Sequence, residues 1–140
     1  MKNLSIYICA VILMCFTGAC KENVEMEKAV EFEIVSVHDI RLKPDVNVKE
    51  FETFVWTELA PIYNKMKGQK LTLVKGDRGI RNNEYAIILT FESIEDRNRI
   101  YPPSGGFVGD FGEDSLWEKF NSMIEVGLGQ QHTDYVRVIH

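Results

Sequence analysis

Residues 32–44 read FEIVSVHDIRLKP, and the pattern of this stretch is the strongest indication of the fold. Its side chains alternate with a period of two, as they do along a β-strand. Val35 and Val37 fall on one face, and the opposite face carries Phe32, Ile34, Ser36, His38, Ile40 and Leu42. Because both faces carry apolar residues, we predict a strand over residues 30–42 that is covered on both sides.

The clearest helical pattern of the chain follows this strand. Asn47 and Glu50 have the three-residue spacing of a capping box. An apolar stripe then recurs at spacings of three and four, through Val48, Phe51, Val55, Leu59, Ile62 and Met66. Pro61 lacks a backbone N–H donor, so we expect a kink or a break near Leu59. Gly68 closes the helix.

The rest of the chain supplies three strands and two shorter helices. We predict a hairpin of strands 71–75 and 84–92, a helix from 93 to about 101, a loop over 102–112, a helix over 114–126 and a strand over 133–139. This order is the split βαβ arrangement of the ferredoxin-like fold. We therefore predict an α+β domain whose four-stranded antiparallel sheet carries its helices on one face.

The other face of that sheet also needs a cover. The predicted strands are apolar on both sides, and the helices suffice for only one side. A second copy of the chain would bury the remaining face, so we expect a homodimer.

Four stretches of the chain resemble the dimeric α+β barrel superfamily. They are Glu33–Pro44, Phe51–Val55, Glu58–Tyr63 and Phe91–Arg97. The superfamily includes antibiotic-biosynthesis-monooxygenase-like, muconolactone-isomerase-like and stress-responsive barrel proteins. The resemblance implies homodimerisation through the sheets and a pocket in each half of the barrel. It does not imply one reaction, because this fold hosts many.

The first twenty residues have the features of a targeting segment. Lys2 precedes an apolar run over residues 6–16, which is shorter than the roughly 20 residues of a membrane-spanning helix. Thr17-Gly18-Ala19-Cys20 resembles the lipobox of bacterial lipoproteins, apart from Thr17, where leucine is usual. The resemblance implies a lipid on Cys20. An ordinary signal peptide cut elsewhere, or a short retained anchor, is the alternative.

The residues after Cys20 are polar and suit a solvated tether. Lys21-Glu22 and the glutamates that follow resemble the export tag of some surface lipoproteins of Gram-negative bacteria. We therefore expect a signal peptide over residues 1–19, a tether over 20–29 and one domain over 30–140. The expected location is the cell envelope, on the outer membrane and facing the surface.

Charge and cysteine usage restrict the function classes. The formal net charge of −5 disfavours nucleic acid, which needs a basic footprint. All three cysteines lie within residues 1–20, so we expect neither a disulfide nor a thiol nucleophile in the domain. No histidine spacing matches a metal site, and no motif indicates a cofactor, so we expect neither.

His38 is the strongest candidate for a catalytic group. Its ordinary pKa lies near neutral pH, and Ser36 shares its face of the strand. If that face lines the barrel, His38 is the natural acid–base or ligand-binding group, and barrel proteins of this superfamily often hold a histidine at a similar place. A hydrogen-bonded structural histidine is the competing interpretation. His132 and His140 are expected to be exposed.

Six further residues are candidate ligand contacts. Trp56 and Tyr63 lie off the apolar stripe of the long helix and could form the mouth of a pocket, or pack on the sheet. Arg137 shares a face of the last strand with Tyr135, where it would need an acidic partner, an anionic ligand or water. Phe107 and Phe111 sit in a glycine-rich loop that we expect to close over His38, or to fill a gap between helices.

Three functions follow from these features. The leading hypothesis is a lipid-anchored barrel that binds a small hydrophobic compound, with cofactor-free monooxygenase or isomerase activity as its catalytic form. The rival is a non-catalytic structural or binding module of the cell surface. Haem binding through His38 is the third, and a lone histidine supports it least.

Overall fold

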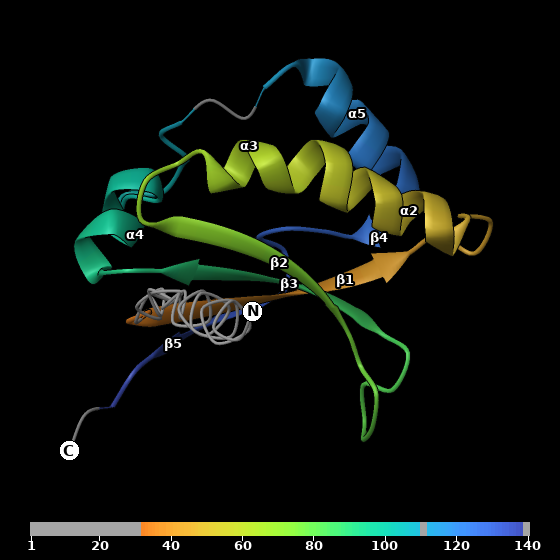
Figure 1. The fold of residues 1–140 in the computed structure, drawn as a ribbon, viewed down its shortest axis with the longest axis horizontal. Coiled ribbons are helices and arrows are strands. Elements are labelled where there is room, and N and C mark those ends of the chain that lie inside the picture. The colour runs from red at the N-terminus through yellow and green to blue at the C-terminus, as the bar shows by residue number, and fades with distance from the viewer. Residues whose placement is uncertain (1–31, 110–111, 139–140) are drawn as a thin grey trace, which may run out of the picture.

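A computed structural model describes residues 32–109 and 112–138 and shows an α+β fold. An open antiparallel sheet carries all its helices on one face (Figure 1). The strands are β1 (Ile34–Leu42), β2 (Gln69–Lys75), β3 (Tyr85–Phe91), β4 (Ile124–Val126) and β5 (His132–Val136). The helices are α2 (Val48–Phe54), α3 (Ala60–Asn64), α4 (Ile94–Ile100) and α5 (Asp114–Met123). The strand order β2-β3-β1-β4 confirms the predicted ferredoxin-like arrangement.

The sheet has five strands, where four were predicted. Two short strands share the free edge of β1: β5 pairs with residues 34–38, and β4 pairs with Arg41 and Leu42. Helix α5 therefore ends at Met123, and the following residues, predicted to be helical, form β4. The physical reason is that the backbone N–H and C=O groups at the end of β1 need hydrogen-bond partners. Residues 124–126 provide these partners as a strand, which they could not do as one more turn of α5.

The predicted alternation of β1 is present, and the helices decide which face is buried. Ile34, Ser36, His38 and Ile40 lie beneath the helices, while Val35 and Val37 face away from them and remain half-buried. The core between sheet and helices consists mainly of Ile34, Phe51, Phe54, Val55, Leu59, Leu71, Ile87, Leu89, Phe91, Ile100 and Phe120.

Pro61 neither breaks the long helix nor ends it. Between α2 and α3 the chain forms a π-helical turn over Val55–Leu59, in which the Ala60 N–H donates to the Val55 carbonyl. A π-turn holds one more residue than an α-helical turn, and widening the helix just before Pro61 accommodates the proline ring. The kink or break expected near Leu59 is therefore a π-helical turn, which contains one more residue than an α-helical turn.

The inserted residue changes which side chains face the sheet. At about 100° per residue, a regular helix would place Tyr63 about 120° around the axis from Phe51, and Ile62 about 20° from it. The π-turn moves the following residues back by about one position. Tyr63 is consequently buried, at 2% exposure, and Ile62 is only half-buried. The predicted apolar stripe was therefore wrong at Ile62, because Tyr63 occupies the buried position instead.

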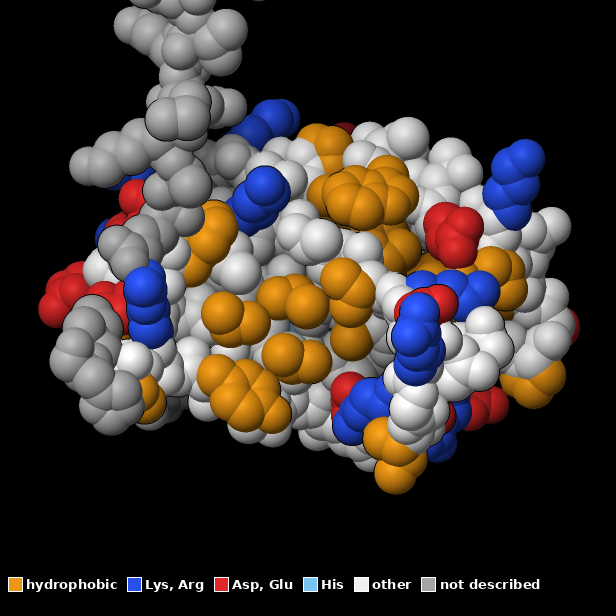
Figure 2. Space-filling view, turned by 60° about the horizontal axis from the view of Figure 1, so that its bottom comes forward, with side chains coloured by type: hydrophobic (Ala, Val, Ile, Leu, Met, Phe, Trp, Pro, Cys, Tyr) orange, Lys and Arg blue, Asp and Glu red, His pale blue; other side chains and the backbone are white. Residues whose placement is uncertain are grey.

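The face of the sheet opposite the helices has no cover within the described residues. Val35 is paired with Thr90 and Tyr135, and Val37 with Ile88 and Thr133, so apolar side chains run across three neighbouring strands. Figure 2, which brings the lower side of Figure 1 forward, shows hydrophobic side chains gathered in the middle of this face. Over residues 32–109 and 112–138, no helix has the length and apolar character needed to cross a bilayer.

Candidate ligand-binding cavity

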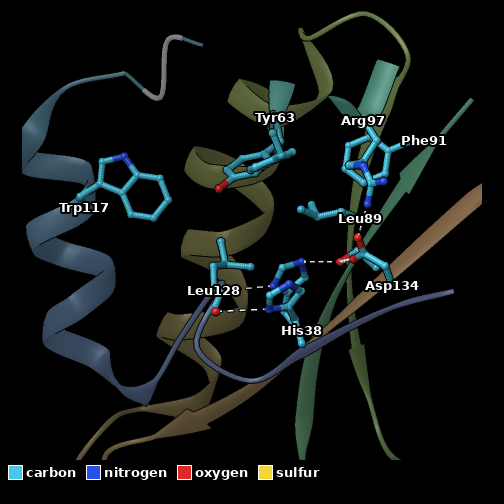
Figure 3. Close-up of a pocket in the computed structure, with 12 residues that line it drawn as sticks. His38, Tyr63, Leu89, Phe91, Arg97, Trp117, Leu128 and Asp134 are labelled. Carbon is cyan, nitrogen blue, oxygen red and sulfur yellow. Dashed lines mark hydrogen bonds and ion pairs between the residues drawn. The ribbon is translucent and has the colours of Figure 1, made fainter. Parts of the chain in front are cut away.

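A cavity of about 500 Å³ lies between the sheet and the helices (Figure 3). Its volume is within the range of small-molecule sites in proteins, and its walls are mostly apolar. It is lined by Ser36, His38, Tyr63, Leu89, Phe91, Arg97, Tyr101, Trp117, Leu128, Gly129, His132 and Asp134. The cavity thus joins residues from β1, β3, β5, three helices and the loop between β4 and β5.

The cavity is on the side of the sheet that the helices cover. Had Ser36 and His38 lined a barrel closed by two sheets, they would face away from the helices. Both instead point toward the helices, because their face of β1 is the one that the helices bury. His38 and Ser36 therefore line a cavity on the helical side of one chain.

A chain of hydrogen bonds forms the polar end of the cavity. His38 Nε2 and Ser36 Oγ are 2.9 Å apart, and Ser36 Oγ donates to Asp134 Oδ1 at 2.5 Å. Asp134 Oδ2 in turn accepts from Arg97 Nη1, an ion pair that links β5 to α4. Asp134 reaches Ser36 because the two residues are direct partners in the β1–β5 register.

The backbone of the β4–β5 loop defines the tautomer of His38. The Gly129 N–H donates to His38 Nδ1 at 3.1 Å, so Nδ1 is an acceptor and carries no proton. In the neutral ring the proton is therefore on Nε2, which donates to Ser36. Ser36 already donates to Asp134, so His38 is not placed to take the Ser36 proton. This geometry differs from that of a serine nucleophile activated by a histidine base.

His38 is held neutral by its surroundings. Burial, reinforced by the neighbouring imidazole of His132, lowers the pKa of His38 to about 4, although Asp134 and Asp39 act in the opposite direction. The side chain is 7% exposed, with both ring nitrogens hydrogen-bonded. These features match the interpretation of a hydrogen-bonded structural histidine that also lines a cavity.

Two tyrosines form another part of the cavity wall. Burial raises the pKa of the Tyr63 and Tyr101 hydroxyls well above their usual range, so both stay neutral. The Tyr101 ring is fixed by edge contact with Phe91 and by Phe107, whose centroids lie 5.9 Å and 5.3 Å away. Trp117 projects from α5 toward the same space (Figure 3).

The other candidate residues that the structure describes do not line this cavity. Trp56 is 50% exposed and borders a separate shallow hollow beside β2. Phe107 is half-buried behind Tyr101, one layer from the cavity, and Phe111 lies outside the described residues. Tyr135 is on the outer face of β5 opposite Val35, and Arg137 follows β5, where its N–H donates to the Glu33 carbonyl. Among the candidates that the structure describes, Ser36, His38 and Tyr63 are the ones that it brings together at the cavity.

Sequence reasoning missed most of the cavity. Asp134 had one local signal. It neighbours Tyr135 in the predicted last strand, so the two side chains lie on opposite faces, and an acidic side chain on the face opposite Tyr135 could have been noticed. Arg97, Tyr101, Trp117 and the Leu128-Gly129 pair carry no local signal, because they come from elements whose packing no pattern specifies. In the described ranges, no group of three or more His, Cys, Asp or Glu side chains could hold a metal ion.

No protein-family model, curated protein or solved structure matches this chain. Function must therefore be inferred from the chemistry of the cavity, because a fold alone does not specify one.

Proposed function

We propose that this protein is a lipid-anchored envelope protein that binds a small, mainly apolar molecule between its sheet and its helices. The observation that carries the proposal is the cavity of about 500 Å³, walled by aromatic and aliphatic side chains with one polar end. A cavity of that kind in a domain of this size is the usual form of a small-molecule site. A purely structural module would fill the same space with side chains.

Binding is favoured over catalysis by the state of His38. A general base needs an available lone pair, and the lone pair of Nδ1 accepts from the Gly129 N–H. Monooxygenase or isomerase activity by His38 would require the β4–β5 loop to leave that nitrogen first. The aromatic walls and the neutral polar end need no such rearrangement to hold a ligand.

Tryptophan fluorescence tests the proposal directly. The chain has two tryptophans, and the Trp56→Phe variant keeps only Trp117, which lines the cavity. Phenylnaphthylamine is an uncharged apolar probe that accepts energy from tryptophan. In the full-length variant in lipid nanodiscs, we expect saturable energy transfer from Trp117 to this probe, beyond that of a blank with empty nanodiscs.

Two matched substitutions separate the cavity from the lipid. Leu128→Phe adds a ring within the cavity wall, and Ile80→Phe adds the same ring at a hairpin tip that is 98% exposed. We expect the first to weaken probe binding by about tenfold or more and the second to leave it unchanged, since only the first occupies the ligand's volume. Equal energy transfer in both variants would contradict the proposal.

The anchor and the dimer complete the proposed function. The lipobox-like Thr17-Gly18-Ala19-Cys20 supports acylation of Cys20, which lies outside the described residues. The apolar outer face, with Val35, Val37 and Ile88 at its centre, supports pairing with a second copy through the sheets. Pairing through the sheets would leave the cavity free, because the cavity lies on the helical side of the sheet.

A further inference from the structure

Arg97 brings unused hydrogen-bond donors to the polar end of the cavity. A guanidinium carries five N–H groups, and in Arg97 one on Nε donates to Asn98 Oδ1 at 2.8 Å while one on Nη1 donates to Asp134. The remaining N–H groups of Arg97 have no partner among residues 32–109 and 112–138. Because the side chain is 27% exposed and lines the cavity, these groups are available to an oxygen atom of a bound molecule.

His132 brings an unused acceptor to the same end. Its Nδ1 lies 3.2 Å from the Gly129 carbonyl, which can only accept, so Nδ1 carries the ring proton. In the neutral ring Nε2 therefore keeps a lone pair, and no donor to it is found in the part of the chain that the structure describes. His132 lines the cavity, and its stacking on His38 fixes the ring before a ligand arrives.

Asp134 adds further acceptor capacity beside these two residues. Its Oδ1 accepts from Ser36 and its Oδ2 from Arg97, and each carboxylate oxygen has a second lone pair. Asp134 is two positions from His132 along β5, so the two side chains lie on the same face of the strand. The polar end therefore presents donors and acceptors side by side, whereas the other walls of the cavity are mostly apolar.

This combination suits a chemical group that both donates and accepts. A carboxylate only accepts, so it would face the lone pairs of His132 and Asp134. An ammonium group only donates, so it would face the N–H groups of Arg97. Arg97 and Asp134 balance each other's charge and His38 is neutral, so neither ion would gain a free counter-charge for its lost hydration. A hydroxyl group donates and accepts at one oxygen atom and has no charge to desolvate.

We propose, on the basis of the binding function above, that the ligand is an uncharged, mainly apolar alcohol whose hydroxyl group accepts from Arg97 and donates to His132 Nε2. The apolar walls supply most of the affinity, and the two hydrogen bonds orient the ligand. His132 thus takes the ligand-binding role that the sequence suggested for His38, whose ring nitrogens are already paired with Gly129 and Ser36.

Five naphthalenes of similar shape test the ligand class: naphthylmethanol, acetylnaphthalene, ethylnaphthalene, naphthoate and naphthylmethylamine. Their affinities for the full-length protein in nanodiscs are measured by calorimetry at about pH 8, where an ordinary imidazole is neutral, with empty nanodiscs as the blank. We expect the alcohol to bind roughly two- to tenfold more tightly than the ketone, which only accepts, and the ketone to bind more tightly than the hydrocarbon. Naphthoate and naphthylmethylamine should both bind more weakly than the alcohol.

Two variants test the contacts separately. His132→Phe keeps a ring that can stack on His38 but removes Nε2, so the alcohol should lose its advantage over the ketone. Arg97→Met removes the donors, so the ketone should lose its advantage over the hydrocarbon. Arg99→Met makes the same substitution on α4 at a side chain that is 52% exposed and does not line the cavity, so it should leave all five affinities unchanged.

Ethylnaphthalene is the internal control, because it has no polar group and reports whether the apolar walls are intact in each variant. Tightest binding by naphthoate or naphthylmethylamine, equal binding of alcohol and ketone by the wild type, or an unchanged alcohol advantage in His132→Phe would overturn the ligand class while leaving the binding function intact. If neither phenylnaphthylamine nor any naphthalene bound, the binding function itself would fail.

Discussion

The imidazole rings of His38 and His132 stack, with centroids 5.1 Å apart and planes that differ by 11°. The two residues are direct partners across β1 and β5, so the strand register places one ring on the other. His132 Nδ1 also lies 3.2 Å from the Gly129 carbonyl, while the N–H of Gly129 donates to His38. The stack, the β4–β5 loop and the cavity wall therefore form one unit that depends on a neutral His38.

This unit predicts a loss of stability in acid. The pKa of His38 is about 4 in the folded protein and about 6.5 in the unfolded chain, so the unfolded state binds the proton first. The stabilisation is complete above the unfolded pKa and is lost as the pH falls from about 6.5 to about 4. The free energy of unfolding, measured in urea, should decrease by up to about 3 kcal/mol for this group over that interval.

The His38→Gln variant is the control for the acid effect. Glutamine does not titrate but retains an N–H group that can reach toward Ser36. The difference in free energy of unfolding between wild type and variant should therefore shrink as the pH falls toward 4. A difference that stays constant from pH 7 to pH 4 would show that His38 is not held neutral.

Removing the Asp134 carboxylate should destabilise the free edge of the sheet. Asp134→Ala leaves Ser36 without its acceptor and Arg97 without its partner, with an expected loss of about 1–3 kcal/mol in the free energy of unfolding. Asp77→Ala breaks the Asp77–Arg78 pair, whose side chains are 88% and 92% exposed, and should change stability little.

Hydrogen exchange locates the effect of Asp134→Ala. Backbone amides of β5 should exchange faster in this variant, while those of β2, on the far edge of the sheet, should keep their wild-type rates. Uniformly faster exchange over the whole sheet would instead mean that Asp134 stabilises the domain without specifically holding β5.

The outer face of the sheet predicts a homodimer that one charge can disrupt. Ile88→Lys places an ammonium group in the middle of this face, beside Val37, and should convert the dimer to monomers. Light scattering of the detergent-solubilised protein, corrected for bound detergent, measures the mass. Ile80→Lys makes the same substitution at the exposed hairpin tip and should leave the dimer intact. A wild-type protein that is already monomeric at micromolar concentration would refute the prediction.

The lipid anchor rests on one residue. Cys20→Ser removes the thiol that would carry the lipid, so the variant should lose incorporation of radiolabelled palmitate and should not enter the detergent phase as the processed wild-type protein does. The Cys15→Ser variant, altered within the apolar segment, should still be acylated. A wild-type protein whose processed N-terminus lies beyond Cys20, with no lipid, would exclude the anchor.

Local sequence patterns were enough to predict the fold class and the order of the elements apart from the short strand β4. The period of two over residues 34–42 and the apolar stripe that starts at Val48 indicate which side chains are buried, although Val48 itself is 43% exposed. These local patterns suffice to predict a ferredoxin-like sheet with helices on one face. They also indicated His38 and Ser36 as neighbours on one face, because alternation along a single strand needs no tertiary information.

The composition of the cavity, by contrast, depends on tertiary contacts that no local pattern specifies. Asp134 meets Ser36 across 98 positions of the chain because β5 pairs with β1 in one register, and a shift by one residue would turn Asp134 to the other face. Tyr63 enters the cavity because a π-turn before Pro61 rotates it onto the buried side. The register of β5 and the π-turn both depend on long-range contacts, which supply hydrogen-bond partners for the backbone and fill the core. The periodicity of a single segment does not specify those contacts.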